Sequence, residues 1–506
     1  MPLIAGIDIG NATTEVALAS DDPQARAFVA SGIVATTGMK GTRDNIAGTL
    51  AALEQALAKT PWSMSDVSRI YLNEAAPVIG DVAMETITET IITESTMIGH
   101  NPQTPGQVVR ILSNPYGIAT FFGLSPEETQ AIVPIARALI GNRSAVVLKT
   151  PQGDVQSRVI PAGNLYISGE KRRGEADVAE GAEAIMQAMS ACAPVRDIRG
   201  EPGTHAGGML ERVRKVMASL TDHEMSAIYI QDLLAVDTFI PRKVEGGMAG
   251  ECAMENAVGM AAMVKADRLQ MQVIARELSA RLQTEVVVGG VEANMAIAGA
   301  LTTPGCAAPL AILDLGAGST DAAIVNAEGQ ITAVHLAGAG NMVSLLIKTE
   351  LGLEDLSLAE AIKKYPLAKV ESLFSIRHEN GAVEFFREAL SPAVFAKVVY
   401  IKEGELVPID NASPLEKIRL VRRQAKEKVF VTNCLRALRQ VSPGGSIRDI
   451  AFVVLVGGSS LDFEIPQLIT EALSHYGVVA GQGNIRGTEG PRNAVATGLL
   501  LAGQAN

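Results

Sequence analysis

Cysteine and histidine are scarce in this chain, with four and six copies among 506 residues. The cysteines, Cys192, Cys252, Cys306 and Cys434, are scattered, and neither they nor the histidines show the spacing of a metal-ligand motif. Closely spaced ligand pairs are the usual sequence sign of a metal centre, and regularly spaced cysteines are that of a disulfide framework. The sequence therefore argues against both, and we interpret the cysteines as ordinary core residues.

Aromatic residues are also few, and the chain has neither an excess of positive charge nor long apolar runs. Aromatics make up 4% of the chain, and the net charge is −12. The densest basic run, residues 417–428, is interleaved with apolar residues and Glu427. It is typical of a solvated helix face, so nucleic acid is not an expected partner. No apolar run has transmembrane length, and the first residues predict a strand instead of a signal peptide. We therefore expect a cytoplasmic protein with no membrane partner.

One motif is present twice. Residues 8–17 read DIGNATTEVA, and residues 314–323 read DLGAGSTDAA. Each stretch lies between apolar runs and combines glycine with small hydroxyl residues, which predicts a strand, a tight turn and a second strand. Glycine lets the backbone come close to a ligand, while converging N–H groups and hydroxyls donate to anionic oxygens. Two such turns facing each other would clamp one polyphosphate from both sides.

The duplication carries more weight than either turn alone, because most glycine-rich hairpins are only turns. It identifies candidate phosphate-binding residues in both turns. They are Asn11, Ala12 and Thr13 in the first turn and Gly316, Ala317, Gly318, Ser319 and Thr320 in the second. The leading acids, Asp8 and Asp314, would point at a cation or its water shell. The alternative for each acid is a local hydrogen bond that stabilises the turn.

A third glycine turn and two helices rich in small residues complete the pattern. Residues 452–456 form a continuous apolar run, typical of a strand buried on both faces, and the sequence GGS follows at 457–459. A glycine pair at the end of such a strand can bring the backbone against a ligand, although a plain strand-to-helix turn is the alternative. Alanine and glycine at helical spacing in residues 292–301 and 491–501 predict two helices packed backbone to backbone.

The order of these elements resembles that of the actin, hexokinase and heat-shock chaperone ATPase superfamily. The resemblance implies an α/β protein with the actin-like ATPase fold, in which two ribonuclease-H-like lobes enclose a nucleotide cleft. Four longer segments are similar to the large subunit of the diol or glycerol dehydratase-reactivating factor. They are GIDIGNATTEVALA at 6–19, the whole of 73–106, SNPYGIATFFGL at 113–124 and LDLGAGSTDAAIV at 313–325. The resemblance covers essentially the whole chain, and residues 73–106 are its most specific part.

The patterning and the resemblance together divide the chain into modules. The expected divisions are 1–100 for the first lobe, 101–106 for a junction, 107–285 for a helical linker and 286–506 for the second lobe, with an insert near 365–414. Within the linker, residues 248–282 carry apolar residues at helical spacing and predict a helix. The first lobe, the second lobe and the linker are each long enough to bury a core of their own.

The family's swivelling domain would be inserted after Gly106, and this chain passes directly to Gln107, so we expect that domain to be missing. The family's magnesium site takes acidic ligands from that domain, together with a threonine that matches Thr104. This chain keeps the threonine and lacks the acidic ligands. Asp8 and Asp314 match the paired acids of the superfamily, and we expect them to act as catalytic residues that hold hydrated magnesium and orient the attacking water.

The nucleoside is expected at the other end of the cleft. The residues expected against the adenosine are Gly457, Gly458 and Ser459. Glu354 and Asp355 would accept from the ribose hydroxyls, or would simply begin a solvated helix. Arg492 and Asn493 would close the pocket, with Arg492 stacked on adenine, or would form a structural helix N-terminus.

The resemblance implies an ATP-dependent reactivating factor, a molecular chaperone that releases damaged cobalamin from inactivated adenosylcobalamin-dependent glycerol or diol dehydratase so that intact cofactor can bind. It implies ATP or ADP and Mg²⁺ as ligands. It also implies a small subunit in a two-plus-two heterotetramer, with the inactivated dehydratase as the client. The sequence does not choose between the two dehydratases and leaves open an association with a bacterial microcompartment. The alternative function is that of an actin-fold small-molecule kinase or a filament-forming ATPase.

Overall fold

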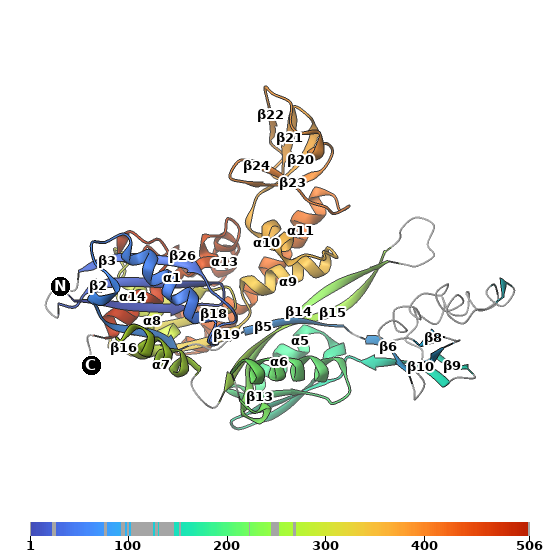
Figure 1. Ribbon diagram of the computed structural model, residues 1–506, viewed down its shortest axis with the longest axis horizontal. Coiled ribbons are helices and arrows are strands. Elements are labelled where there is room, and N and C mark those ends of the chain that lie inside the picture. Colours follow the sequence, from blue (N-terminus) through green and yellow to red (C-terminus); the bar gives the residue numbers. More distant parts are fainter. Residues whose placement is uncertain are drawn as a thin grey trace.

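The computed structural model describes residues 2–22, 27–74, 78–84, 86–92, 97–98, 101–102, 125–126, 130, 146–150, 153–221, 223–243, 252–266 and 270–503. Thr104 lies outside these ranges. Figure 1 shows packed α/β lobes at one end, an upright module of short strands, and an extended part that long strands connect to the lobes. Among the described residues, no helix combines the length and the apolar character needed to span a lipid bilayer.

The first lobe is built on a five-stranded sheet in the order β16-β4-β1-β2-β3. Its strands are β1 (Leu3–Ile9), β2 (Thr13–Ser20), β3 (Phe28–Ala35), β4 (Val67–Glu74) and β16 (Glu285–Val291). β1, β2 and β3 are antiparallel neighbours, whereas β4 and β16 continue the sheet in parallel with β1. The helices α1 (Asn45–Leu57) and α7 (Gln270–Leu282) share an apolar core with alternate strand residues such as Leu3 and Ile7.

This sheet crosses the module boundaries expected from the sequence. β16 and α7 complete the first lobe, although they lie at the end of the expected linker and the start of the expected second lobe. The physical reason is that neighbouring parallel strands require a crossover connection. The chain leaves the first lobe after β4, forms the strands and helices between Val78 and Ala266, and then returns to add β16 in parallel beside β4. The first lobe therefore combines residues 2–74 with residues 270–291.

The second lobe repeats the same sheet in the order β19-β18-β17-β25-β26. Its strands are β17 (Leu310–Leu315), β18 (Ser319–Val325), β19 (Ile331–Ala337), β25 (Phe452–Val456) and β26 (Val479–Gln482). The antiparallel and parallel pairings match those of the first sheet strand for strand. The predicted pair of ribonuclease-H-like lobes is confirmed, and the duplicated motif occupies the first hairpin of each lobe.

Two helices of small residues lie between the sheets. α8 (Glu292–Ala300) and α14 (Ala494–Ala502) share one apolar core with residues of both lobes. A Cβ atom on Gly299 would lie 1.9 Å from the carbonyl oxygen of Ala494, and one on Gly498 would lie 1.9 Å from that of Met295. No side chain fits at those distances, so the two backbones are in direct contact. The predicted backbone-to-backbone packing is confirmed.

Within the described residues 153–221, 223–243 and 252–266, the expected helical linker contains strands as well as helices. The helices there include α5 (Ala182–Cys192) and α6 (His205–Thr221), and the strands include β11 (Asn164–Gly169), β12 (Arg173–Asp177), β13 (Val195–Gly200), β14 (Ile228–Lys243) and β15 (Cys252–Ala266). β15 lies within the helix predicted over 248–282, so that prediction is wrong for its first half. Small aliphatic residues are compatible with a helix or a strand. Residues 252–266 form a strand because they pair with β14 along their whole length.

The extended part is made of strands from distant segments. β5 (Val78–Met84) pairs with β15, and β6 (Thr86–Ile92), β9 (Val146–Thr150) and β10 (Gly153–Pro161) form a three-stranded sheet. A further short pair joins β7 (Met97–Ile98) to β8 (Asn101–Pro102).

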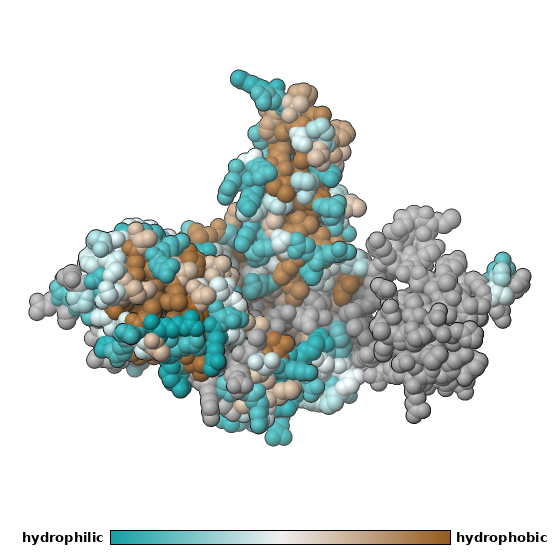
Figure 2. All heavy atoms as spheres, viewed as in Figure 1, coloured by the Kyte–Doolittle hydropathy of each residue, from teal (hydrophilic) through white to brown (hydrophobic). Residues whose placement is uncertain are grey.

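The region near 365–414 is a five-stranded antiparallel sheet that stands away from the second lobe (Figure 1). Its strands are β20 (Leu367–Ser372), β21 (Ser375–His378), β22 (Val383–Phe385), β23 (Val398–Lys402) and β24 (Glu405–Pro408). Below it in Figure 1 lie α10 (Leu356–Lys364) and α11 (Leu415–Lys426), and α9 (Gly340–Glu350) packs against both helices. In the second lobe, α12 (Thr432–Val441) packs against β18 and β19, and α13 (Ile465–Ser474) packs against β26. Figure 2 shows apolar residues at the surface of this module, where Phe374, Phe385 and Phe395 are exposed.

Candidate functional site

The turns of the two motif hairpins face each other across a cleft of about 560 Å³. The same hydrogen bond closes each turn, from Gly10 N–H to the carbonyl oxygen of Thr13 (2.9 Å) and from Gly316 N–H to that of Ser319 (3.1 Å). The turns also touch, since a Cβ atom on Gly318 would lie 2.3 Å from Nδ2 of Asn11. This arrangement is the one that a two-sided polyphosphate clamp requires.

Most of the site residues predicted from the sequence line this cleft. They are Asp8, Asn11, Ala12, Thr13, Asp314, Gly316, Ala317, Ser319, Gly457, Gly458, Ser459, Arg492 and Asn493. Gly318 does not line it and packs against Asn11 instead. Thr320 is fully buried, and its hydroxyl donates to the carbonyl oxygen of Gly338 at 2.8 Å, which gives it a structural position behind the turn.

The turn after β25 brings the backbone against the second motif. Gly457 has a φ of 85°, and a Cβ atom there would lie 2.2 Å from Oδ1 of Asp314, so only glycine fits. The Ser459 hydroxyl donates to the carbonyl oxygen of Gly316 at 2.8 Å. A Cβ atom on Gly458 would lie 2.9 Å from Nη1 of Arg492. The turn therefore contacts both the second hairpin and the residues that precede α14. These contacts distinguish it from a turn that only joins a strand to a helix.

Neither of the two residues expected against the ribose lines the cleft. Asp355 accepts from Ser357 N–H at 2.8 Å and caps α10, and neither it nor Glu354 lines the cleft. Glu360 and Lys363, further along the same helix, do line it. Lys363 Nζ donates to Glu360 (2.6 Å) and to the carbonyl oxygen of Gly340 (2.9 Å). Burial alone would raise the pKa of Glu360, but Lys363, together with hydrogen bonds from Lys364 and Ser344, lowers the pKa to about 2. The sequence signal for this pair is its i,i+3 spacing on a capped helix.

The guanidinium of Arg492 is hydrogen-bonded to residues of the first hairpin and does not project freely into the cleft. Its Nη1 donates to Glu15 (2.9 Å) and to the hydroxyl of Thr13 (3.2 Å). The N–H of Asn493 donates to the other carboxylate oxygen of Glu15 at 2.6 Å. Glu15 thereby ties the start of α14 to the first hairpin. This geometry favours the helix N-terminus interpretation of Arg492 over stacking on adenine, and Glu15 itself was not among the sequence candidates.

A buried group of charged side chains forms the floor of the cleft. Lys40, which is 1% exposed, pairs with Glu292 at the start of α8 (2.9 Å), and Asn73 Nδ2 donates to Asp8 (2.7 Å). Burial raises the pKa of Asp8, and the Glu292 carboxylate raises it further against the opposing effect of Lys40. Burial likewise raises the pKa of Asp314. Negative charge exceeds positive charge here, which favours a cation with oxygen ligands.

Lys40, Asn73 and Glu292 were not predicted as site residues. Each comes from a different element, and none belongs to a glycine motif, so the sequence offers no local signal for them. The clamp they support contains oxygen ligands that fit hydrated Mg²⁺, because Asp8 and Asp314 both face the cleft and neither forms an ion pair with a cation among the described residues. The repeated sheet and the clamp between its two copies place this protein in the class of actin-like ATPase folds.

Comparison with known proteins specifies the family within that class. The model of the diol dehydratase reactivase ATPase-like domain matches residues 176–503. The chain is 54% identical to the diol dehydratase-reactivating factor large subunit of Klebsiella michiganensis, over 99% of this chain and 98% of that protein. It is also 54% identical, with the same coverage, to the propanediol dehydratase-reactivating factor large subunit of Citrobacter freundii. The chain belongs to the family of dehydratase-reactivating factor large subunits.

Two solved structures agree with this result. A glycerol dehydratase reactivase is 83% identical, with a TM-score of 0.77 and full coverage of both chains. A diol dehydratase-reactivating factor in nucleotide-free form is 53% identical, also with a TM-score of 0.77 and full coverage of both chains.

The comparisons correct the expectation about the swivelling domain. The model of the DD-reactivating factor swivelling domain matches residues 105–155, so part of that domain is present where none was expected. The alignment with the Klebsiella protein runs over 601 positions, more than the 506 residues of this chain. A segment of the relative therefore has no counterpart here.

Proposed function

We propose that this chain is the ATP-driven subunit of a dehydratase-reactivating factor, which releases damaged cobalamin from inactivated glycerol or diol dehydratase. The observation that carries the proposal is the facing pair of phosphate hairpins in a chain similar over its whole length to reactivating-factor large subunits. Family membership favours this function over the small-molecule kinase and filament-forming alternatives.

The two hairpins bind the phosphates in this proposal. Backbone N–H groups of both turns and the hydroxyls of Thr13 and Ser319 donate to phosphate oxygens from opposite sides of the cleft. Asp8 and Asp314 accept from the water shell of Mg²⁺ and orient the attacking water. The bound ion neutralises charge on the phosphates. Its positive charge also favours the ionised forms of both aspartates, which offsets the rise in their pKa caused by burial.

The nucleoside lies between the turn at Gly457 and α10 in this proposal. Glu360 accepts from a ribose hydroxyl, and Lys363 holds that carboxylate ionised and in place. Gly458 lines the cleft beside Arg492 and contacts the adenosine through its backbone, and Leu461 and Phe463 also line the cleft. This assignment replaces the ribose contacts at Glu354 and Asp355.

The chaperone step depends on the lobes responding to the γ-phosphate. Only a closed clamp brings both hairpins against all three phosphates, so ATP and ADP stabilise different lobe positions. α8 and α14 contact both sheets and transmit this difference. A ligand drives a conformational change only through different affinities for the two states. The ATP and ADP forms would therefore differ in affinity for the dehydratase, with a small subunit completing a two-plus-two complex.

Calorimetric titration with ADP and Mg²⁺ tests the nucleotide site. We expect one site per chain and at least tenfold weaker binding in Asp314→Ala, because an aspartate against the cation is lost. Asp355→Ala is the matched control, since this acid caps α10 outside the cleft and should bind ADP as the unaltered chain does. Absence of ADP binding in the unaltered chain would remove the basis of the proposal.

Reactivation of a dehydratase tests the chaperone function. Glycerol or diol dehydratase inactivated with cyanocobalamin is mixed with the factor, its small subunit, ATP, Mg²⁺ and fresh adenosylcobalamin. We expect activity to return and free cyanocobalamin to pass a filter that retains protein. Asp8→Ala should block repeated cycles. If cofactor exchange is equally fast with that variant, ATP turnover does not drive the release.

A further inference from the structure

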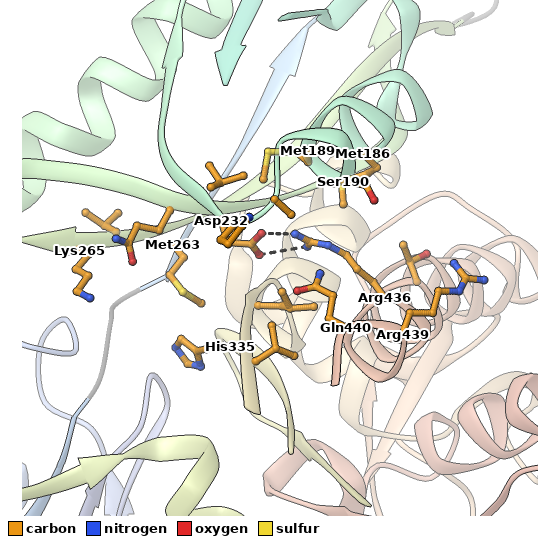
Figure 3. A pocket seen from close by; sticks show the side chains of 18 of the residues that line it. Met186, Met189, Ser190, Asp232, Met263, Lys265, His335, Arg436, Arg439 and Gln440 are labelled. Carbon is orange, nitrogen blue, oxygen red and sulfur yellow. Dashed lines mark hydrogen bonds and ion pairs between the residues drawn. The ribbon is translucent and has the colours of Figure 1, made fainter. Parts of the chain in front are cut away.

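A pocket of about 710 Å³ shares Glu292 with the nucleotide cleft. Figure 3 shows Asp232 of β14 paired with Arg436 of α12 in this pocket. His335 on β19 lines the same pocket and is paired through Nδ1 with Asp321 of the second motif. Each pair joins two elements of the fold, so neither points to a ligand. The nucleotide cleft, in contrast, contains an exposed aromatic ring.

This ring belongs to Phe463, which lies between the turn at 457–459 and α13 and lines the nucleotide cleft. The residue is 44% exposed. Leu461 and Pro366 line the same cleft and add apolar surface. A cleft that combines apolar side chains with a few polar groups is the usual form of a small-molecule site. Single exposed apolar residues are nevertheless common on protein surfaces, so the significance of Phe463 depends on what holds its ring.

Two buried cations hold the ring of Phe463. Lys426 Nζ lies 4.4 Å from the ring centroid, and Arg422 Cζ lies 4.9 Å from it. A cation at such a distance is attracted to the face of an aromatic ring. The two residues are four positions apart on α11 and project from the same side of the helix, so both approach the same face of the ring. The other face is left for the cleft.

The residues on either side of Phe463 in the chain hold Lys426 in place. Lys426 Nζ pairs with Asp462 and with Glu464, each at 2.8 Å. Asp462 Oδ1 also accepts from the N–H groups of Glu464 (2.9 Å) and Ile465 (3.1 Å), which satisfies N–H groups at the start of α13. The backbone on both sides of the ring is therefore fixed, and the ring has little freedom to turn away from the cleft.

Arg422 connects this support to the insert. Its guanidinium pairs with Glu464 at 2.8 Å and with Glu379, also at 2.8 Å. Glu379 directly follows β21 in the sheet of the insert and does not line the nucleotide cleft. The N–H of Glu379 donates to the carbonyl oxygen of Leu367 on β20 at 3.0 Å. The wall of the cleft and the insert therefore share one charge network.

Stability alone does not account for two buried cations at this position. Arg422 and Lys426 are both fully buried, and removing a charge from water is unfavourable even where carboxylates are near. Apolar side chains of similar volume would hold a helix against a loop at least as stably. The cations add directed contacts with the ring and with the carboxylates that flank it. The network therefore indicates that the orientation of Phe463 matters.

We propose that the nucleobase stacks on Phe463, and that Arg422, Lys426 and Glu379 are positioning residues that hold its ring. The inference rests on the proposed nucleotide site and adds a residue that binds the base. Stacking on an aromatic face tolerates every base, so this contact supplies affinity and not the choice of adenine. Because Glu379 belongs to the insert, a partner that moves the insert would also change the affinity for nucleotide.

Calorimetric titration with ADP and with pyrophosphate, both with Mg²⁺, tests the stacking contact. We expect Phe463→Ala to bind ADP roughly tenfold more weakly and to bind pyrophosphate as the unaltered chain does, because only ADP carries a base. Phe463→Tyr keeps the ring and should retain most of the ADP affinity. Phe385→Ala is the matched control, since this phenylalanine is 78% exposed on the insert and does not line the cleft. Equal ADP affinity in a folded Phe463→Ala overturns the proposal.

The same titrations of Glu379→Gln test the positioning role. We expect ADP to bind roughly threefold more weakly, because the ring is held less firmly, while pyrophosphate binds as before. A purely structural role would change the affinity for both ligands alike, or for neither. Glu384→Gln is the matched control, because this acid of the insert pairs with His378 (2.9 Å) instead of the network. Unchanged ADP affinity in Glu379→Gln would overturn the link to the insert.

Photolabelling of the unaltered chain with 2-azido-ADP gives an answer that does not depend on a variant folding. Peptide mass spectrometry should find the label on the peptide that contains Phe463, and excess ADP should prevent labelling. Label found only on other peptides overturns the proposal. If the unaltered chain binds neither ADP nor pyrophosphate, the proposed nucleotide site itself fails, which is a different result from ADP binding that does not involve Phe463.

Discussion

The contact between α8 and α14 predicts an unusual response to adding one methyl group. In Gly498→Ala, the new Cβ would lie 1.9 Å from the carbonyl oxygen of Met295 and 2.6 Å from its carbonyl carbon. Ordinary van der Waals contact begins at 3.4 Å. The obstacle is backbone, which cannot rotate away as a side chain can. The two helices must therefore separate by roughly an ångström, which loosens the core that joins the lobes.

The expected size of the effect follows from two opposing contributions. Overpacking a well-packed core costs about 1–3 kcal/mol. Alanine is favoured over glycine within a helix by about 1 kcal/mol, which offsets part of that cost. We therefore expect Gly498→Ala to lower the free energy of unfolding by up to about 2 kcal/mol. Gly208→Ala in α6 is the matched control, because the nearest atom to its Cβ is Arg212 Nη1 at 3.9 Å. That variant should gain about 0.5–1 kcal/mol.

Urea unfolding followed by circular dichroism measures both variants, and fluorescence of the single tryptophan, Trp62, reports on the first lobe, whose core it contacts. Gly299→Ala adds a second check, because its Cβ would meet Ala494 on the same helix pair. One separation of the helices relieves both overlaps, so the double variant should lose less stability than the sum of the two single losses. If Gly498→Ala is as stable as Gly208→Ala, the two backbones are not in contact and the reasoning fails.

Three further predictions concern buried charge. Lys363→Met should weaken ADP binding about tenfold in calorimetry, because Glu360 loses the buried lysine at 2.6 Å and keeps only the more exposed Lys364 at 2.8 Å; equal affinity would exclude the ribose role. Arg422→Met should lower the free energy of unfolding in urea by about 3–5 kcal/mol, because the fully buried guanidinium pairs with Glu464 (2.8 Å); a loss below 1 kcal/mol would contradict this. Burial raises the pKa of Glu464, but Arg422 and Lys426 together lower it to a net value below the ordinary 4.5. The stabilisation that the ionised Glu464 contributes is present above about pH 4.5 and is lost as the pH falls below that value. Glu464→Gln should therefore reduce the fall in the free energy of unfolding at acid pH.

The sequence by itself determined the parts of this protein that are contiguous in the chain. The two hairpins, the turn at 457–459 and the small-residue helices each need only a short run of residues, because glycine, hydroxyl and apolar positions specify turns and close packing locally. Their order and the long family-specific segments were enough to predict the actin-like fold and the family. Of the two leading acids, Asp8 and Asp314, the structure places both in the cleft.

Only the tertiary structure decided which other side chains meet those motifs. Lys40, Glu292 and His335 come from a loop, a helix start and a strand, and no spacing in the chain relates them. The same reason explains the error at β15 and the position of Asp355 outside the cleft. Small aliphatic residues fit helix or strand until pairing with β14 decides between them, and an acidic helix start looks the same whether it caps the helix or faces a ligand. Contacts between distant segments depend on how sheets and helices pack, and this packing is a property of the whole fold.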